Sequence, residues 1–132
     1  IGLRNARLNF RQNEQSHIME NVIYNELRMR GLNVDVGVVE YNYKDENKKT
    51  IRKSLEIDFI INRGSNRYYI QSALNVDTKE KQVQETESLR RIGDSFKKVV
   101  IVRNNVVPRF DDDGILYIGV EDFLLDETTL DL

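Results

Sequence analysis

A chain of 132 residues is long enough for one globular domain and too short for two, and 39% hydrophobic with 32% charged residues is typical of a folded domain. Cysteine is absent, which excludes disulfides, thiolate nucleophiles and cysteine-bound metals, and the one histidine, His17, excludes a multi-histidine metal site. No apolar run approaches the roughly 18 residues that cross a bilayer, so no membrane partner is expected. Any metal ion must be bound by oxygen ligands.

The charges are unevenly distributed along the chain. All 20 basic residues stand in positions 1–110, so the net charge of -2 conceals a mildly basic body that permits weak nucleic-acid contact. The chain begins with Ile1 instead of methionine, and we therefore expect a piece of a longer cytoplasmic protein. In this interpretation residues 1–15 are a linker from an upstream part, residues 16–126 form the domain and residues 127–132 are an acidic tail.

The first predicted helix runs from Ser16, a suitable N-cap, to Gly31, a suitable C-cap. Its apolar residues recur at spacings of three and four and form one wide stripe that we expect to be buried. Glu20 falls near the edge of this stripe, so its carboxylate approaches the buried face. The stripe consists of Ile18, Met19, Val22, Ile23, Leu27 and Met29.

Alternating apolar residues predict two antiparallel strands, at 34–43 and 55–61, separated by the polar turn 44–49. Within the second strand, alternation places Leu55, Ile57, Phe59 and Ile61 on one side. A turn at 62–66 precedes a third strand at 67–74. The result is a three-strand antiparallel meander.

A polar surface helix is predicted next, beginning with an approximate capping box of Asp77 and Glu80 and continuing to Gly93. Its expected core contacts are Val83, Leu89 and Ile92. The following β-branched run, 99–102, is typical of a strand buried on both faces, and a crossover through the helix makes it parallel to the third strand. A strand at 115–118 and a helical turn at 120–125 follow. The predicted fold class is α/β: a mixed β-sheet flanked by helices.

Three polar side chains are candidates for chemistry. Asp58 lies between Ile57 and Phe59, an unusual position for an acid, and Gln71 lies among apolar residues of the neighbouring strand. If the two strands pair, Asp58 and Gln71 converge with Glu20 at one end of the sheet. Oxygen ligands in such an arrangement hold magnesium in hydrolases, where the metal activates water.

The order of elements and these residues together resemble the PD-(D/E)XK, restriction-endonuclease-like superfamily. More narrowly, residues 2–126 resemble the C-terminal domain of unknown function of bacterial AAA-type ATPases. The resemblance implies a restriction-endonuclease-like core with a Glu on the first helix, an Asp on the second strand and a Glu-x-Lys on the third. Here those motifs read Met19-Glu20-Asn21, Glu56-Ile57-Asp58-Phe59 and Gln71-Ser72-Ala73.

The third motif departs from the pattern of the superfamily. Gln71 replaces a metal-binding carboxylate with a neutral amide, and Ala73 stands where the resemblance places a lysine. We therefore expect Glu20 and Asp58 to bind Mg²⁺ weakly at best, in a vestigial site. Losing such a lysine removes a contribution of about 2.7–4 kcal/mol in comparable sites. Lys79 or Lys81 is an alternative source of the missing ammonium group.

Structural roles are open for the same residues. Asp58 is equally well explained as an acid that accepts hydrogen bonds from backbone amides or pairs with an arginine, and Glu20 as a charge at the edge of a helix surface. His17 is expected to pack or cap at the helix start. The tyrosines are interpreted as core or cross-strand residues in preference to base-stacking platforms; they are Tyr24, Tyr41, Tyr43, Tyr68 and Tyr69.

Three functions are consistent with these observations. The first is a non-catalytic, degenerate nuclease-fold domain that serves an AAA-type ATPase in recognition or interaction. The second is a Mg²⁺-dependent DNA nuclease with a variant site, and the third is a structural dimerisation or regulatory domain. No phosphate-binding glycine motif is present, so ATP binding is expected only in the upstream ATPase module, the expected partner, and this fragment requires no cofactor.

Overall fold

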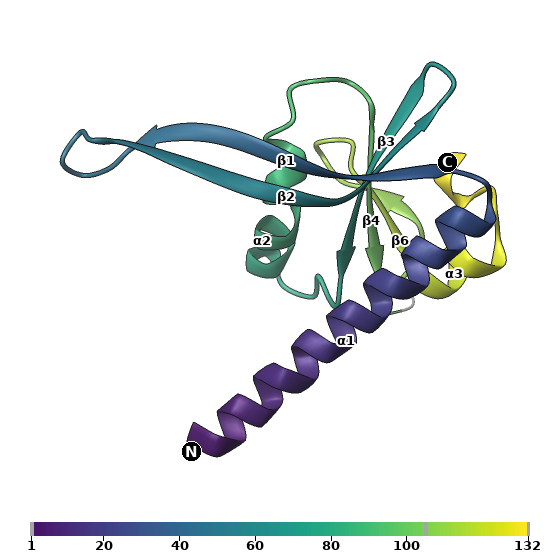
Figure 1. Ribbon diagram of the computed structural model, residues 1–132, viewed down its shortest axis with the longest axis horizontal. Helices are drawn as coiled ribbons and strands as arrows, with labels where there is room; N and C mark the ends of the chain where they lie inside the picture. Colours follow the sequence, from purple (N-terminus) through teal and green to yellow (C-terminus); the bar gives the residue numbers. More distant parts are fainter. Residues whose placement is uncertain (1, 105, 132) are drawn as a thin grey trace.

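The computed structural model describes residues 2–104 and 106–131, and in the first helix the side chains of residues 2–10 and 12 are not described. A six-stranded mixed sheet forms its centre, with helices against both faces (Figure 1). In the described part of the chain, no helix combines the length and apolar character needed to cross a membrane. The elements are α1 (Gly2–Met29), β1 (Asn33–Lys44), β2 (Thr50–Arg63), β3 (Asn66–Ala73), α2 (Lys79–Arg90), β4 (Lys97–Val102), β5 (Arg109–Phe110), β6 (Leu116–Gly119), α3 (Val120–Leu125) and the short 3-10 helix η1 (Thr129–Asp131).

The strand order is β1-β2-β3-β4-β6-β5. β1, β2 and β3 pair antiparallel, and β3 pairs parallel with β4 after the crossover through α2, which confirms the predicted mixed α/β fold class. β4 and β6 are also parallel. The two-residue strand β5, which the sequence did not predict, adds an antiparallel edge beside β6.

Helix α1 begins at Gly2, so the prediction that Ser16 is its N-cap is wrong. Residues 2–15 contain no proline, and a capping residue alone does not interrupt a helix whose backbone hydrogen bonds can continue. The C-terminal end is as predicted. Gly31 has φ +78°, its N–H bonds to the Arg28 carbonyl, and the Leu32 N–H bonds to the Leu27 carbonyl, which is the pattern that ends a helix at glycine.

Two apolar clusters cover the two faces of the sheet. Met19, Ile23 and Leu27 of α1 belong to the first cluster, together with Phe59 and Ile61 of β2. The buried part of α1 is narrower than predicted, because the helix meets the sheet along one line. Ile18, Val22 and Met29 of the predicted stripe have exposed fractions of 56%, 38% and 82%.

Helix α2 belongs to the second cluster, to which it contributes Leu89. The predicted capping box is wrong: the N-cap is Thr78, whose side-chain oxygen accepts a hydrogen bond from the Lys81 N–H at 3.1 Å. Threonine at this position satisfies one of the free amides of the first turn. Val83 points to solvent, whereas Leu89 is buried and Ile92 packs against the cluster as predicted.

A β-bulge in β2 changes which side chains face each layer. Asp35 pairs with Ile60 and Gly37 pairs with Ile57, so the two residues Asp58 and Phe59 oppose the single residue Val36. The predicted strict alternation is therefore wrong across this point. Ile57 lies in the α2 layer, whereas Phe59 and Ile61 lie in the α1 layer.

The C-terminal segment lies against the α1 side of the body. Arg30 donates a hydrogen bond to the Phe123 carbonyl, its guanidinium lies 4.5 Å from the centroid of the Phe123 ring, and its Nε bonds Glu26 at 3.1 Å. Leu130, within the segment predicted as an acidic tail, belongs to the first cluster. Helix α1 is thus fixed at its C-terminal end by both the sheet and α3.

Candidate functional site

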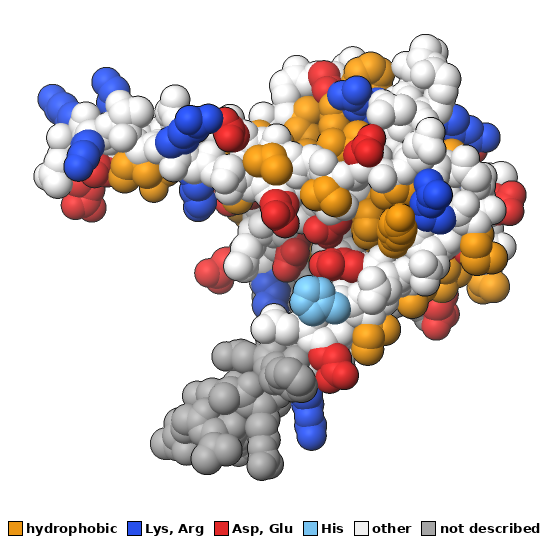
Figure 2. Space-filling model, viewed as in Figure 1, with side chains coloured by type: hydrophobic (Ala, Val, Ile, Leu, Met, Phe, Trp, Pro, Cys, Tyr) orange, Lys and Arg blue, Asp and Glu red, His pale blue; other side chains and the backbone are white. Residues whose placement is uncertain are grey.

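A pocket of about 470 Å³ opens where β2 and β3 part. Glu20, Asp58 and Gln71 all line it, as the sequence predicted, together with Ala73 and Lys81. Lys79, the other lysine considered, is not among the lining residues. Figure 2 shows acidic side chains gathered in the hollow between α1 and the base of the β1–β2 hairpin. The complete lining is Asn13, Ser16, Met19, Glu20, Asp58, Gln71, Ser72, Ala73, Leu74, Asn75, Lys81, Gln84 and Glu85.

Side chains connect β2 and β3 where their backbone pairing stops. The last backbone pair on this side is Phe59 with Ile70. Beyond it, the Asp58 N–H donates to Gln71 Oε1 at 3.0 Å, and Asp58 Oδ2 accepts from the Ser72 N–H at 3.0 Å and from Ser72 Oγ at 2.8 Å. We call Asp58, Gln71 and Ser72 the side-chain bridge. It satisfies backbone amides that the parted strands would otherwise leave without partners.

The environment of Asp58 opposes its negative charge. Burial raises the pKa of the Asp58 carboxyl, hydrogen bonds from the Ser72 amide and hydroxyl act against that increase, and the charge of Glu56 adds to it. The net result of these effects is that the pKa of Asp58 lies above its ordinary value. The alternative in which hydrogen bonds from a backbone amide hold Asp58 is confirmed.

Two further carboxylates share the pocket with Asp58. Burial and then the negative charge of Asp58 raise the pKa of Glu20, against a smaller opposing effect of His17. The same two causes raise the pKa of Glu85 on α2, with Lys81 acting against them. His17 Nδ1 lies 3.8 Å from Glu20, and the exposed fraction of the His17 side chain is 77%. The pocket therefore concentrates negative charge at positions where water solvates it incompletely.

Within the described ranges, no three acidic or histidine side chains lie close enough together to hold a metal ion. Glu20, Asp58 and Glu85 line the same pocket but are too far apart to form a metal coordination sphere together. Magnesium requires anionic oxygens in a tight octahedral arrangement. Weak Mg²⁺ binding by Glu20 and Asp58 stays a prediction.

Sequence reasoning missed Glu85, Asn75 and the role of Ser72. The spacing of four between Lys81 and Glu85 places both on one face of α2, a signal that was available. Nothing local marked the other two, because their positions depend on the parting of β2 from β3. Asn75 Oδ1 is buried at the pocket without a hydrogen-bond partner in the described structure.

The fold and site define a mixed α/β domain with an acidic pocket where two strands of its sheet part. Residues 15–123 match the model of the family described as "Domain of unknown function (DUF4143)", and because the match covers most of the chain, the chain belongs to this family.

A curated relative is an uncharacterized protein of Haemophilus influenzae. It is 31% identical over 124 residues, which are 94% of this chain and 27% of the relative. The chain thus spans about a quarter of the length of that relative. No solved structure matches this chain.

The side-chain bridge yields a stability prediction. We expect Gln71→Ala and Ser72→Ala each to lower the free energy of unfolding by about 1–2 kcal/mol, because the first leaves the Asp58 N–H without its acceptor and the second removes the hydroxyl donor to Asp58 Oδ2. Gln84→Ala, which lines the same pocket from α2 without joining the bridge, should change it by less than about 0.5 kcal/mol. Urea unfolding monitored by circular dichroism measures all three. Equal effects at positions 71 and 84 would contradict the role of the bridge.

The raised pKa values predict the direction of a pH dependence. A carboxyl whose pKa is higher in the folded state binds its proton more tightly there than in the unfolded state. Its contribution to stability therefore decreases as the pH rises above the ordinary pKa, which is 4.5 for Glu85. Glu85→Gln should therefore stabilise the domain at pH about 7 by roughly 0.2–1 kcal/mol, and by little at pH about 4. Thermal unfolding at the two pH values measures this difference. Glu46→Gln, at an exposed turn outside the pocket, is the control; an equal pH-dependent gain there would refute the assignment to the pocket.

Proposed function

We propose that this domain is a non-catalytic recognition or interaction module of an AAA-type ATPase, derived from a restriction-endonuclease-like nuclease. The side-chain bridge carries the proposal. Gln71 Oε1 and Asp58 Oδ2, oxygens that would serve a metal ion in a working site, accept hydrogen bonds that hold β2 and β3. Ala73, where the resemblance places a lysine, provides no ammonium group.

The proposed origin of the domain is supported by its topology. A helix, an antiparallel meander, a crossover helix and a parallel strand occur in the order that the resemblance implies. The relative extends well beyond the region matched by this chain, which agrees with a module that works within a longer protein. Hydrolysis of ATP would belong to the upstream module, and the whole protein would act in the cytoplasm.

A working nuclease is the second candidate, and Lys81 favours it. This lysine lines the pocket from α2, and its positive charge acts to lower the pKa of Glu85. Helix α2 could thus supply the ammonium group that β3 lacks. A Mg²⁺ or Mn²⁺ ion at Glu20 and Asp58 would then supply Lewis-acid chemistry. The shortage of convergent carboxylates among the described residues weighs against this candidate.

Cleavage of DNA separates the two candidates. We expect no cleavage of supercoiled plasmid above background with Mg²⁺ or Mn²⁺, because the site lacks the charges that stabilise a phosphoryl transition state. Gel electrophoresis over a protein titration measures this. The matched variants are Asp58→Ala and, as control, Asp35→Ala on an exposed part of β1. Cleavage that is lost in the first variant and kept in the second would establish the nuclease instead.

Coupling to an ATPase module is tested by binding. Titration calorimetry of the domain against the upstream ATPase module of its own full-length protein should show saturable binding. Removal of the domain from that protein should leave ATP hydrolysis in place, because nucleotide chemistry lies outside the domain. The absence of saturable binding would contradict the proposal.

A further inference from the structure

The β1–β2 hairpin extends beyond the body of the protein (Figure 1). β3 pairs with β2 only from Phe59 to Arg63, so among the described strands β1 alone pairs with the N-terminal half of β2. We call residues 42–53 the arm. They include five basic and two acidic residues, a net charge of +3, whereas the whole chain carries -2. The rest of residues 1–110 also carries a net +3, and residues 111–132 carry -8, so the arm has the higher density of positive charge within a mildly basic segment.

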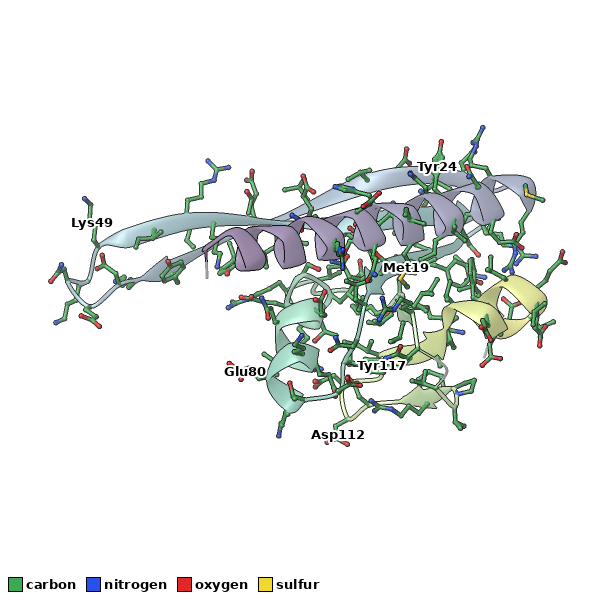
Figure 3. All side chains as sticks on the ribbon, turned by 90° about the horizontal axis from the view of Figure 1, so that it is seen from below. Met19, Tyr24, Lys49, Glu80, Asp112 and Tyr117 are labelled. Atoms are coloured by element: carbon green, nitrogen blue, oxygen red, sulfur yellow. The ribbon has the colours of Figure 1, made fainter. Side chains whose placement is uncertain are left out.

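The arm is fixed at its base and free beyond it. The Tyr41 hydroxyl donates to Glu87 Oε1 at 3.1 Å, and the Arg91 guanidinium lies 4.0 Å from the centroid of the Tyr41 ring, so α2 holds the hairpin at this point. Past Tyr41, the described hydrogen bonds and ion pairs of the arm run only within the hairpin. Figure 3 shows Lys49 at the far end of the hairpin, well away from α2 and α3.

The positive charge on the arm is poorly neutralised. Among the described residues, four arm lysines are exposed and have no carboxylate at ion-pair distance: Lys44, Lys48, Lys49 and Lys53. Arg52 pairs with Glu40. Asp45 accepts hydrogen bonds from the N–H groups of Asn47 and Lys49, both at 2.9 Å, so this acid is used to shape the turn. An anionic partner would supply the missing counter-charge.

Lys48 occupies a backbone conformation that disfavours a side chain. Its φ is +58°, which makes it the one described non-glycine residue in the left-handed region. Glycine adopts this conformation with the least strain, and it is the usual choice at such a turn position. A lysine at this position adds a charge to the end of the arm at the expense of backbone geometry. Strain retained in this way is typical of positions that serve a function.

The basic groups lie on both faces of the ribbon and at its end. Cross-strand partners share a face, so Lys53, opposite Tyr41, lies on the same face as Tyr43, whereas Lys44 and Arg52 lie on the other face. A flat acidic protein surface could neutralise only one of these faces. The groove of a DNA duplex has a wall of phosphates on each side, and the major groove, about 12 Å wide, admits a two-stranded ribbon.

We propose that the β1–β2 arm binds double-stranded DNA by entering a groove and contacting the backbone phosphates through its lysines. The acidic side chains of the pocket and the acidic segment 111–132 repel phosphate, which favours contact through the arm. The inference concerns a surface remote from the pocket and goes beyond the proposed function. It names a partner for the recognition module and requires no catalysis.

Fluorescence anisotropy with a labelled duplex of about 20 base pairs, at salt concentrations from about 50 to 200 mM, tests the proposal. The triple variant Lys44→Gln/Lys49→Gln/Lys53→Gln should bind at least about tenfold more weakly at the lowest salt. Its plot of log affinity against log salt should be shallower by about 2.7, since each lost phosphate contact removes about 0.9 from the slope. All three side chains are exposed, so the thermal unfolding midpoint should be that of the wild type.

The matched control is Arg11→Gln/Arg28→Gln/Lys79→Gln, which lowers the net charge by the same amount at exposed positions of α1 and α2. It should bind as the wild type does. Equal losses in the two triple variants, no binding by the wild type at the lowest salt, or equally tight binding of single-stranded DNA or of an RNA duplex would each overturn the proposal. Selective loss in the arm variant supports it.

The variant Lys48→Gly distinguishes an effect of the lysine charge on DNA binding from an effect on the stability of the fold. Glycine relieves the positive φ, so the unfolding midpoint should stay the same or rise, while DNA binding weakens and the salt slope decreases by about 0.9. Unchanged binding would overturn the place of Lys48 in the site. Gel analysis of the same DNA keeps the two proposals distinct, because cleaved DNA would refute the non-catalytic module and leave the arm, whereas intact DNA without binding would refute the arm alone.

Discussion

Where the backbone pairing of β2 and β3 stops, hydrogen bonds from the backbone to the side chains of Asp58 and Gln71 connect the two strands. The arrangement of the domain depends on these bonds. Because the strands separate there, a pocket opens between the helices of the two layers. Because the same separation leaves β2 without a third strand, the hairpin continues outward as an isolated ribbon. One local event in the sheet thus produces both the candidate site and the arm.

The two features carry opposite charge. Around the pocket, burial and mutual repulsion oppose the ionisation of Glu20, Asp58 and Glu85, whereas the lysines of the arm stand in water with little counter-charge. A domain with a net charge of -2 is therefore a strongly polarised one. Such a separation orients an approaching polyanion before contact, an effect that falls with ionic strength. The average composition conceals this property.

Particular residues show where sequence reasoning succeeded and where it failed. The proximity of Glu20, Asp58 and Gln71 was predicted from the pairing of the second and third strands, and all three line the pocket although the alternation expected for β2 fails at Asp58. The prediction that Ile57 faces the same layer as Phe59 was wrong, because a bulge opposite Val36 reverses the alternation. No residue type in β2 predicts this bulge. The start of α1 was wrong for another reason: a good N-cap residue permits a helix start but does not impose one.

The sequence by itself determined the kinds and order of the longer helices and strands, although not the short strand β5, and the charge carried by each segment, since these follow from local preferences and periodicity. The tertiary structure alone decided how narrow the buried stripe of α1 is, that Glu85 shares the pocket with Glu20 and Asp58, and that residues 42–53 stand clear of the body. These outcomes depend on where one strand stops pairing with another. That point is set by contacts between residues distant in the chain, which no local pattern records.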